Sequence, residues 1–259
     1  MISLASTVAF ALIAFFALVS TPGWNRVSET FFNFKLSADV WPAVLDGLWL
    51  NLRVLGYTVV SVTVFASLIA FARTLRNPVF FPLRAIARGY VDFFRGIPLI
   101  IVLYLVGFGL PGLRIESLGR IPVELLGTIA LTLTYSAYVA EVFRAGIESV
   151  HVSQRLAARS LGLTYSQSMR LVVLPQALRK VVPPLMNDLV SLQKDVGLIS
   201  VLGAVDAVRA AQIEVAHYAN FTPYVIAGLL FVLMALPTLY ITDRFTERLR
   251  SREQAGTVL

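Results

Sequence analysis

The sequence predicts an all-α integral membrane protein with six transmembrane helices. Hydrophobic residues make up 57% of the 259-residue chain and charged residues only 14%, which is too apolar for an ordinary soluble domain. A bilayer core about 30 Å thick takes roughly 20 apolar helical residues, and six segments approach that length. Basic residues also concentrate in alternate connecting loops, as in multi-pass membrane proteins. We therefore expect one helical domain embedded in a membrane.

Five of the six spans follow directly from runs with few or no charges. In chain order they are residues 4–19, 54–72, 96–113, 125–140 and a segment within 215–242 that is clearest from Pro223 onward. The first run lacks the basic residues that normally open a secretory signal peptide. We expect it to be a retained helix, with cleavage as the alternative.

The remaining span, residues 182–202, carries five polar positions: Asn187, Asp188, Ser191, Lys194 and Asp195. Counted from the first of them, they fall at i, i+1, i+4, i+7 and i+8, which is one stripe of an α-helix. Ionisable groups inside a span cost about 2.5 to 3.5 kcal/mol each, so they usually face a bundle interior or an aqueous pathway. We interpret the stripe as the lining of a substrate pathway. A shorter span ending near Leu192, followed by a solvated Lys194–Asp195 pair, is the alternative.

The basic residues orient the spans. Most of them lie within 73–88, 144–180 and 244–252, so these regions are predicted to be cytosolic, with both termini on the same side. The net charge of +7 reflects this bias and the attraction of anionic lipid headgroups. It gives no reason to expect nucleic-acid binding.

Several kinds of chemistry are excluded or made improbable by residue usage. The chain has no cysteine and only two histidines, His151 and His217, which are far apart in sequence. Thiolate sites are therefore excluded, and the sequence predicts neither a histidine metal site nor a histidine-dependent hydrolase. No Gly-Lys dipeptide occurs, so a Walker-type phosphate loop is absent. We predict no catalytic, metal or cofactor site here, and ATP, if used, is hydrolysed by another chain.

The loop between the fourth and fifth spans has its own predicted fold. Ser153 is expected to cap a first short helix, which Gly162 ends by accepting a left-handed backbone. Thr164 and Gln167 have the spacing of a capping box that opens a second helix, and Pro175 is expected to limit it. Two short helices at a fixed angle result.

Apolar side chains on this loop predict contact with a partner. Leu161, Leu163 and Met169 are expected to be exposed and to suit insertion into a groove of another protein. Three arginines rim them: Arg155, Arg159 and Arg170. A loop that folds back on its own protein is the alternative.

The loop resembles the EAA loop of the permease subunits of bacterial ABC importers. The matching positions are Ala157, Ala158, Gly162, Val172, Leu174 and Pro175. Leu156 stands where the family commonly has glutamate. The resemblance implies docking of a separate ATPase by Ala157, Ala158, Leu161, Gly162, Leu163, Thr164 and Pro175.

The flanking segments 92–100, 137–147 and 174–195 look like those of permeases for polar amino acids. This similarity runs from about residue 45 to the sixth span, so the first helix is an addition to a five-helix core. The predicted organisation is an N-terminal helix and external loop over 1–44, a permease domain over 45–250 that includes the coupling loop 149–177, and a cytosolic tail over 251–259.

The resemblance implies a multi-pass protein of the bacterial inner membrane that moves polar amino acids or related solutes inward by alternating access. Its implied partners are ATPase subunits that bind ATP and Mg²⁺, an extracytoplasmic solute-binding protein and a second permease subunit. For a zwitterion, Lys194 would meet the carboxylate and Asp188 or Asp195 the ammonium, unless these three groups neutralise one another. A secondary transporter is the alternative, although it would have no use for the docking loop.

Two other sets of charged residues are expected to form ion pairs only with near neighbours in the sequence. Glu141, Arg144 and Glu148 have the spacing of a charge ladder on one helix surface. Arg95 lies three residues after Asp92 and is expected to pair with it.

Overall fold

The computed structural model describes residues 2–75 and 77–256, and within them every regular element is a helix. Residue 76 and residues 257–259 of the predicted tail lie outside the described residues. The α-helices are α1 (Ile2–Val19), α2 (Trp24–Phe31), α3 (Phe34–Thr74), α4 (Phe81–Gly96), α5 (Leu99–Tyr104), α6 (Leu110–Gly112), α7 (Glu116–Gly119), α8 (Val123–Glu148), α9 (Val152–Ser160), α10 (Tyr165–Ser168), α11 (Leu174–Asp195), α12 (Ala207–Tyr218) and α13 (Thr222–Gly256). Short 3₁₀ segments cover Pro78–Phe80 and Val196–Leu202, and π-helical turns cover Leu105–Gly109 and Met169–Val173.

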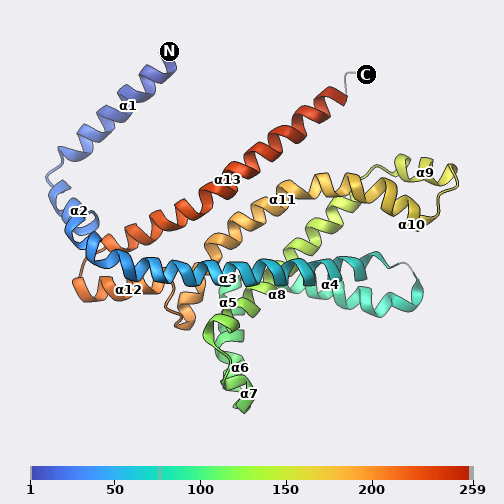
Figure 1. Ribbon diagram of the computed structural model, residues 1–259, viewed down its shortest axis with the longest axis horizontal. Helices are drawn as coiled ribbons and strands as arrows, with labels where there is room; N and C mark the ends of the chain where they lie inside the picture. Colours follow the sequence, from blue (N-terminus) through green and yellow to red (C-terminus); the bar gives the residue numbers. More distant parts are fainter. Residues whose placement is uncertain (1, 76, 257–259) are drawn as a thin grey trace.

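The 41-residue helix α3 forms the axis of the bundle. Its middle packs with α4, α5, α8 and the 3₁₀ segment after α11 around a core that includes Val54, Leu103, Leu131 and Ile199. Its N-terminal part packs on α12 and α13 around a second core that includes Val40. In Figure 1, α3 runs horizontally and α8 crosses it.

Among the residues that the structure describes, three helical segments are long and apolar enough to cross a membrane, and the count reaches five if each of two bent helix pairs is one span. The continuous candidates are 24–74, 123–148 and 222–247. The bent pairs join α4 to α5–α6 at 107° and the helix ending at residue 202 to α12 at 53°. The all-helical membrane fold is therefore confirmed, whereas six separate straight spans are not.

The clearest part of the sixth predicted span, from Pro223 onward, lies within the continuous helix α13, whereas the third predicted span differs from the structure. In the third span, residues 99–112 form one helix that includes a π-helical turn, and this helix is shorter than a full span and is joined to α4 by a 107° bend at Ile97–Pro98. Residues 215–242 are divided between α12 and α13 by a break at Ala219, whose φ is +50°. Hydropathy averages over such breaks, so it cannot locate them.

The N-terminal region is more helical than expected. The predicted external loop contains α2 and the start of α3. Helix α1 stands apart from the bundle in Figure 1, and Phe10 and Ile13 are exposed on it. In a membrane these side chains would contact lipid or another subunit.

A buried polar network joins α3 to the break before α12. The Asn51 side-chain amide donates to the Asp206 carboxylate at 2.9 Å and to the Val196 carbonyl at 3.2 Å. The Asn51 side-chain carbonyl accepts from the Ala207 amide at 3.0 Å. Gly47, one turn before Asn51, lets the backbones approach closely, because a Cβ there would lie 2.5 Å from the Ala207 amide nitrogen. This network fixes the bent segment against the bundle axis.

Candidate functional site

The loop expected to dock a partner forms a helix–turn–helix at one end of the molecule, the end that also carries the α3–α4 connection (Figure 1). Its first helix, α9, begins one residue after His151, whose ring nitrogen accepts from the Ser153 amide at 3.3 Å. The prediction of Ser153 as the cap is therefore wrong. Sequence rules favour serine at this position, but here the chain enters the helix two residues earlier.

The turn after α9 has the predicted geometry. Gly162 has a φ of +83°, its amide donates to the Arg159 carbonyl and the Leu163 amide donates to the Ala158 carbonyl. This pair of hydrogen bonds defines a Schellman motif with glycine at its left-handed position. Thr164 and Gln167 then form the complete capping box that opens α10. Two adjacent sequence signals thus fix the angle between α9 and α10.

Pro175 does not limit the second helix, which corrects the prediction. The helix continues from α10 through the π-helical turn Met169–Val173 into α11. Pro175 lies in the first turn of α11, and the widened π-helical turn is the irregularity that precedes it. Proline is tolerated where its missing N–H needs no helical partner.

The exposure of the loop side chains divides them into two groups. Leu161 is 82% exposed at the tip, and Leu156 is 59% exposed. Ala157, Gly162, Thr164 and Pro175 are also exposed. Leu163 is only half-buried rather than open, and Ala158 is buried. The loop therefore presents an apolar tip and keeps one alanine inward.

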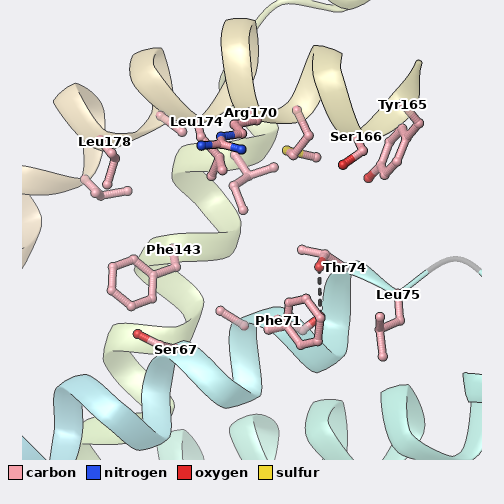
Figure 2. A pocket seen from close by; sticks show the side chains of 15 residues that line it. Ser67, Phe71, Thr74, Leu75, Phe143, Tyr165, Ser166, Arg170, Leu174 and Leu178 are labelled. Carbon is pink, nitrogen blue, oxygen red and sulfur yellow. Dashed lines mark hydrogen bonds between the residues drawn. The ribbon is translucent and has the colours of Figure 1, made fainter.

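Met169, expected to be exposed, packs inward against a small core of Val150, Val173 and Ala177. It also lines an apolar cavity of about 790 Å³ between the loop and the end of α3. Figure 2 shows Tyr165 and Arg170 on the loop side of this cavity, and Phe71 and Leu75 on the α3 side. Because this cavity lies between the loop and α3, any contact between the two must come from residues outside its lining.

The five polar residues of the predicted pathway all lie on α11, which continues without a break to Asp195. Asn187 and Lys194 are exposed, whereas Asp188, Ser191 and Asp195 are half-buried. The opposite side of the helix carries Leu192 and Val196 into the core. Helix α11 thus extends past Leu192 and carries Lys194 and Asp195 in its last turn.

Hydrogen bonding differs among the charged members of the stripe. The Asp195 carboxylate accepts from the Tyr135 hydroxyl of α8 at 2.7 Å. One carboxylate oxygen of Asp188 is buried and has no partner among the described residues. Within 2–75 and 77–256, Lys194 forms no ion pair. Among the described residues, no ion pair joins Lys194 to Asp188 or Asp195.

Two functional features were missed by sequence reasoning. Tyr135 of α8 is buried, and its hydroxyl donates a hydrogen bond to Asp195 of α11. Glu141 was assigned to a ladder on one helix, and its pair with Arg144 is confirmed. It also pairs with Arg73 of α3, and Arg95 pairs with it rather than with Asp92. Partners on other helices cannot be read from spacing within one helix.

Comparison with known proteins identifies a family that covers most of the chain. The family of binding-protein-dependent transport system inner membrane components matches residues 63–251. The probable glutamine ABC transporter permease protein GlnM of Bacillus subtilis is 37% identical over 68% of this chain and 84% of its own length. The arginine transport system permease protein ArtQ of the same species is 34% identical over 85% of this chain and 99% of its own.

Solved structures show the same fold. A crystal structure of an amino acid ABC transporter with histidines aligns with a TM-score of 0.76 and 32% identity, over 83% of this chain and 98% of that one. The MetNI methionine ABC transporter aligns with a TM-score of 0.61 and 20% identity, over 80% of this chain and 96% of that one, which supports the fold alone. The family match extends over most of the chain, from the middle of α3 into α13. This chain is therefore a multi-pass membrane protein that belongs to the family of binding-protein-dependent transport system inner membrane components.

Proposed function

We propose that this chain is the permease subunit of an ATP-driven importer for polar amino acids or closely related solutes. The observation that carries the proposal is the α9–α10 loop, which is rigidly capped yet holds Leu161 82% exposed at its tip. A rigid apolar tip at the end of a membrane bundle suits a groove on another protein. The relatives GlnM and ArtQ are named as permeases for amino acids, which supports the substrate class.

The docking surface consists of Ala157, Ala158, Leu161, Gly162, Leu163, Thr164 and Pro175. In our proposal the exposed members contact a separate ATPase, while Ala158 and Leu163 hold the turn in shape. The ATPase binds ATP and Mg²⁺, and its closure moves the loop so that the permease alternates between inward and outward openings. Two permease chains, identical or related, would seat two ATPases.

The substrate pathway follows the stripe of Asn187, Asp188, Ser191, Lys194 and Asp195 on α11. A zwitterion needs both a cation and an anion along its route, because a desolvated charge without a partner is costly. Lys194 is free to meet a carboxylate, and the unpartnered oxygen of Asp188 to meet an ammonium. Asp195 is held by Tyr135 and is suited to a fixed contact.

The proposed organisation keeps α1 as an added sixth span before a core of five. Residues 1–44 then contain α1 and the external connection, residues 45–250 the permease domain with its coupling loop at 149–177, and residues 251–259 a cytosolic tail. Both termini face the cytosol. An extracytoplasmic solute-binding protein delivers the substrate to the opposite face.

The test is ATP-driven uptake in vesicles that contain this chain, its ATPase and its binding protein, across a panel of polar amino acids. We expect uptake that requires nucleotide and saturates with one class of substrate. Uptake at full rate without nucleotide would instead support a secondary transporter.

The pathway assignment has its own test in the same vesicles. Lys194→Met and Asp195→Asn should each reduce uptake at least about thirtyfold, because losing a hydrogen-bonded charge from a buried contact costs about 2 kcal/mol or more. ATPase docking, measured in parallel, should be unchanged. Unaltered apparent affinity and rate in both variants would remove these residues from the pathway.

A further inference from the structure

A cluster of five charged side chains connects α3, α4 and α8 just before the coupling loop. The carboxylate of Glu141 lies 2.8 Å from the Arg73 guanidinium and 2.5 Å from that of Arg144. Arg95 approaches the same carboxylate at 3.7 Å. Arg144 also pairs with Glu148, one turn further along α8. We call these five residues the Glu141 cluster.

The cluster is partly shielded from water. The side chain of Arg73 is 12% exposed and that of Glu141 is 19% exposed, whereas the Arg120–Glu116 pair elsewhere in the chain is 77% and 80% exposed. An exposed ion pair contributes little. Removing one partner of a shielded pair leaves a poorly hydrated charge and is much more costly. The shielded ion pairs of Glu141 therefore strongly favour the present arrangement of α3 relative to α8.

Two basic side chains from α9 and α11 donate hydrogen bonds to the C-terminal end of α8. The ammonium of Lys180 on α11 donates to the Ser149 carbonyl at 3.0 Å, and the guanidinium of Arg155 on α9 donates to the Ile147 carbonyl. These carbonyls lie at the C-terminal end of α8, where they lack helical partners and attract cations. The loop is thus fastened to α8 about two turns beyond Glu141.

Direct packing between the loop and α3 is sparse at this level. The apolar cavity of about 790 Å³ separates Phe71 and Leu75 of α3 from the start of α11 (Figure 2). A second cavity of about 190 Å³ lies between Arg73 and Arg144 on one side and Arg155 of the loop on the other. The loop is therefore connected to α3 mainly through α8, which packs on α3 and is also joined to α3 and α4 by the ion pairs of Glu141.

We propose that Glu141 is a positioning residue that makes α3 and α4 follow α8 when the coupling loop is displaced. Displacement of the loop pulls on the end of α8 through Arg155 and Lys180, and Glu141 passes the movement to Arg73 and Arg95. The inference rests on the proposed function, because it assigns Glu141 a role in converting the ATPase stroke into transport. Glu141 contacts neither the substrate stripe nor the docking surface.

The experiment measures solute transported per ATP hydrolysed, in vesicles that contain the whole complex. Glu141→Gln should lower this ratio at least about fivefold, the lower end of typical coupling between sites, while the ATPase still docks and hydrolyses ATP. The matched control, Glu116→Gln, removes the carboxylate of the exposed pair and should leave the ratio unchanged.

A double variant separates positioning from simple stabilisation. Glu141→Gln leaves the shielded Arg73 guanidinium without its carboxylate partner. Adding Arg73→Gln should therefore raise the thermal stability of the permease back toward wild type. If Glu141 positions the helices, the transport-to-ATP ratio stays low in the double variant. Recovery of the ratio together with stability would overturn the inference, as would a normal ratio in Glu141→Gln alone. Failure of the wild-type complex to import solute with ATP would instead refute the proposed function.

Discussion

Gly162 provides the sharpest single-residue test of the coupling loop. Its φ of +83° lies in the left-handed region, and two hydrogen bonds of the Schellman motif depend on that conformation. A Cβ at this position would meet no heavy atom within 4 Å. Gly162→Ala therefore strains the backbone of the α9–α10 turn without creating a clash.

The size of the effect follows from the backbone alone. A non-glycine residue in the left-handed region costs about 1 to 2 kcal/mol. If the turn relaxes to avoid this cost, the angle between α9 and α10 changes and Leu161 moves away from its docked position. Affinity for the ATPase should then fall by roughly 5- to 30-fold. Asparagine tolerates this conformation better than alanine, so Gly162→Asn should lose less.

The assay is titration of the purified ATPase against the permease in lipid nanodiscs. Two control variants accompany it. Gly89→Ala lies within α4, where a Cβ meets nothing within 4 Å, and should bind normally. Gly203→Ala is strained in the same way as Gly162→Ala, because φ is +94°, but it lies before α12 at the other end of the bundle. It should lower thermal stability without weakening docking.

The reasoning would be refuted if Gly162→Ala bound the ATPase as tightly as wild type while remaining folded. It would also be refuted if Gly203→Ala weakened docking to the same extent, because the loss would then reflect general destabilisation. A selective loss at Gly162 is the expected outcome.

Two further variants test the docking tip and the fold. Leu161→Ser should weaken ATPase binding by roughly 10- to 150-fold in Kd, since burying a leucine side chain contributes about 1.5 to 3 kcal/mol. The thermal stability of the permease should not change. Unchanged affinity in the same titration would exclude Leu161 from the interface. Asn51→Leu should lower the free energy of unfolding by at least about 2 kcal/mol, because the Asp206 carboxylate and the Ala207 amide lose their partner. Thermal unfolding in detergent measures this, with Asn187→Leu as the exposed control, and equal midpoints for the two variants would contradict the role of the network.

Sequence reasoning succeeded where the determinant is local. Gly162, Thr164 and Gln167 adopt the predicted geometry, because a left-handed glycine and a capping box are specified by a few adjacent residues. The polar stripe on α11 was also predicted, since periodicity places its members on one helix face. The first short helix, the start of the second and the helix that carries the polar stripe could therefore be located without a structure.

Sequence reasoning failed where the determinant is a distant partner or a bend. The links from Glu141 to Arg73 and Arg95 cross between helices, and nothing in their spacing indicates them. Pro175 was expected to limit a helix, but the preceding π-helical turn lets the helix continue. The bends within the two helix pairs likewise escape hydropathy analysis, because hydropathy reports composition and not the direction of the chain.

The most direct test of the central claim uses a unique label on the docking tip. The chain has no cysteine, so Leu161→Cys creates a single site for crosslinking to the ATPase, with Arg120→Cys in the α7–α8 connection as the control. The account predicts an ATPase crosslink at Leu161 whose yield changes when ATP binds, and none at Arg120. No crosslink at Leu161 in a complex that transports solute with ATP would contradict it.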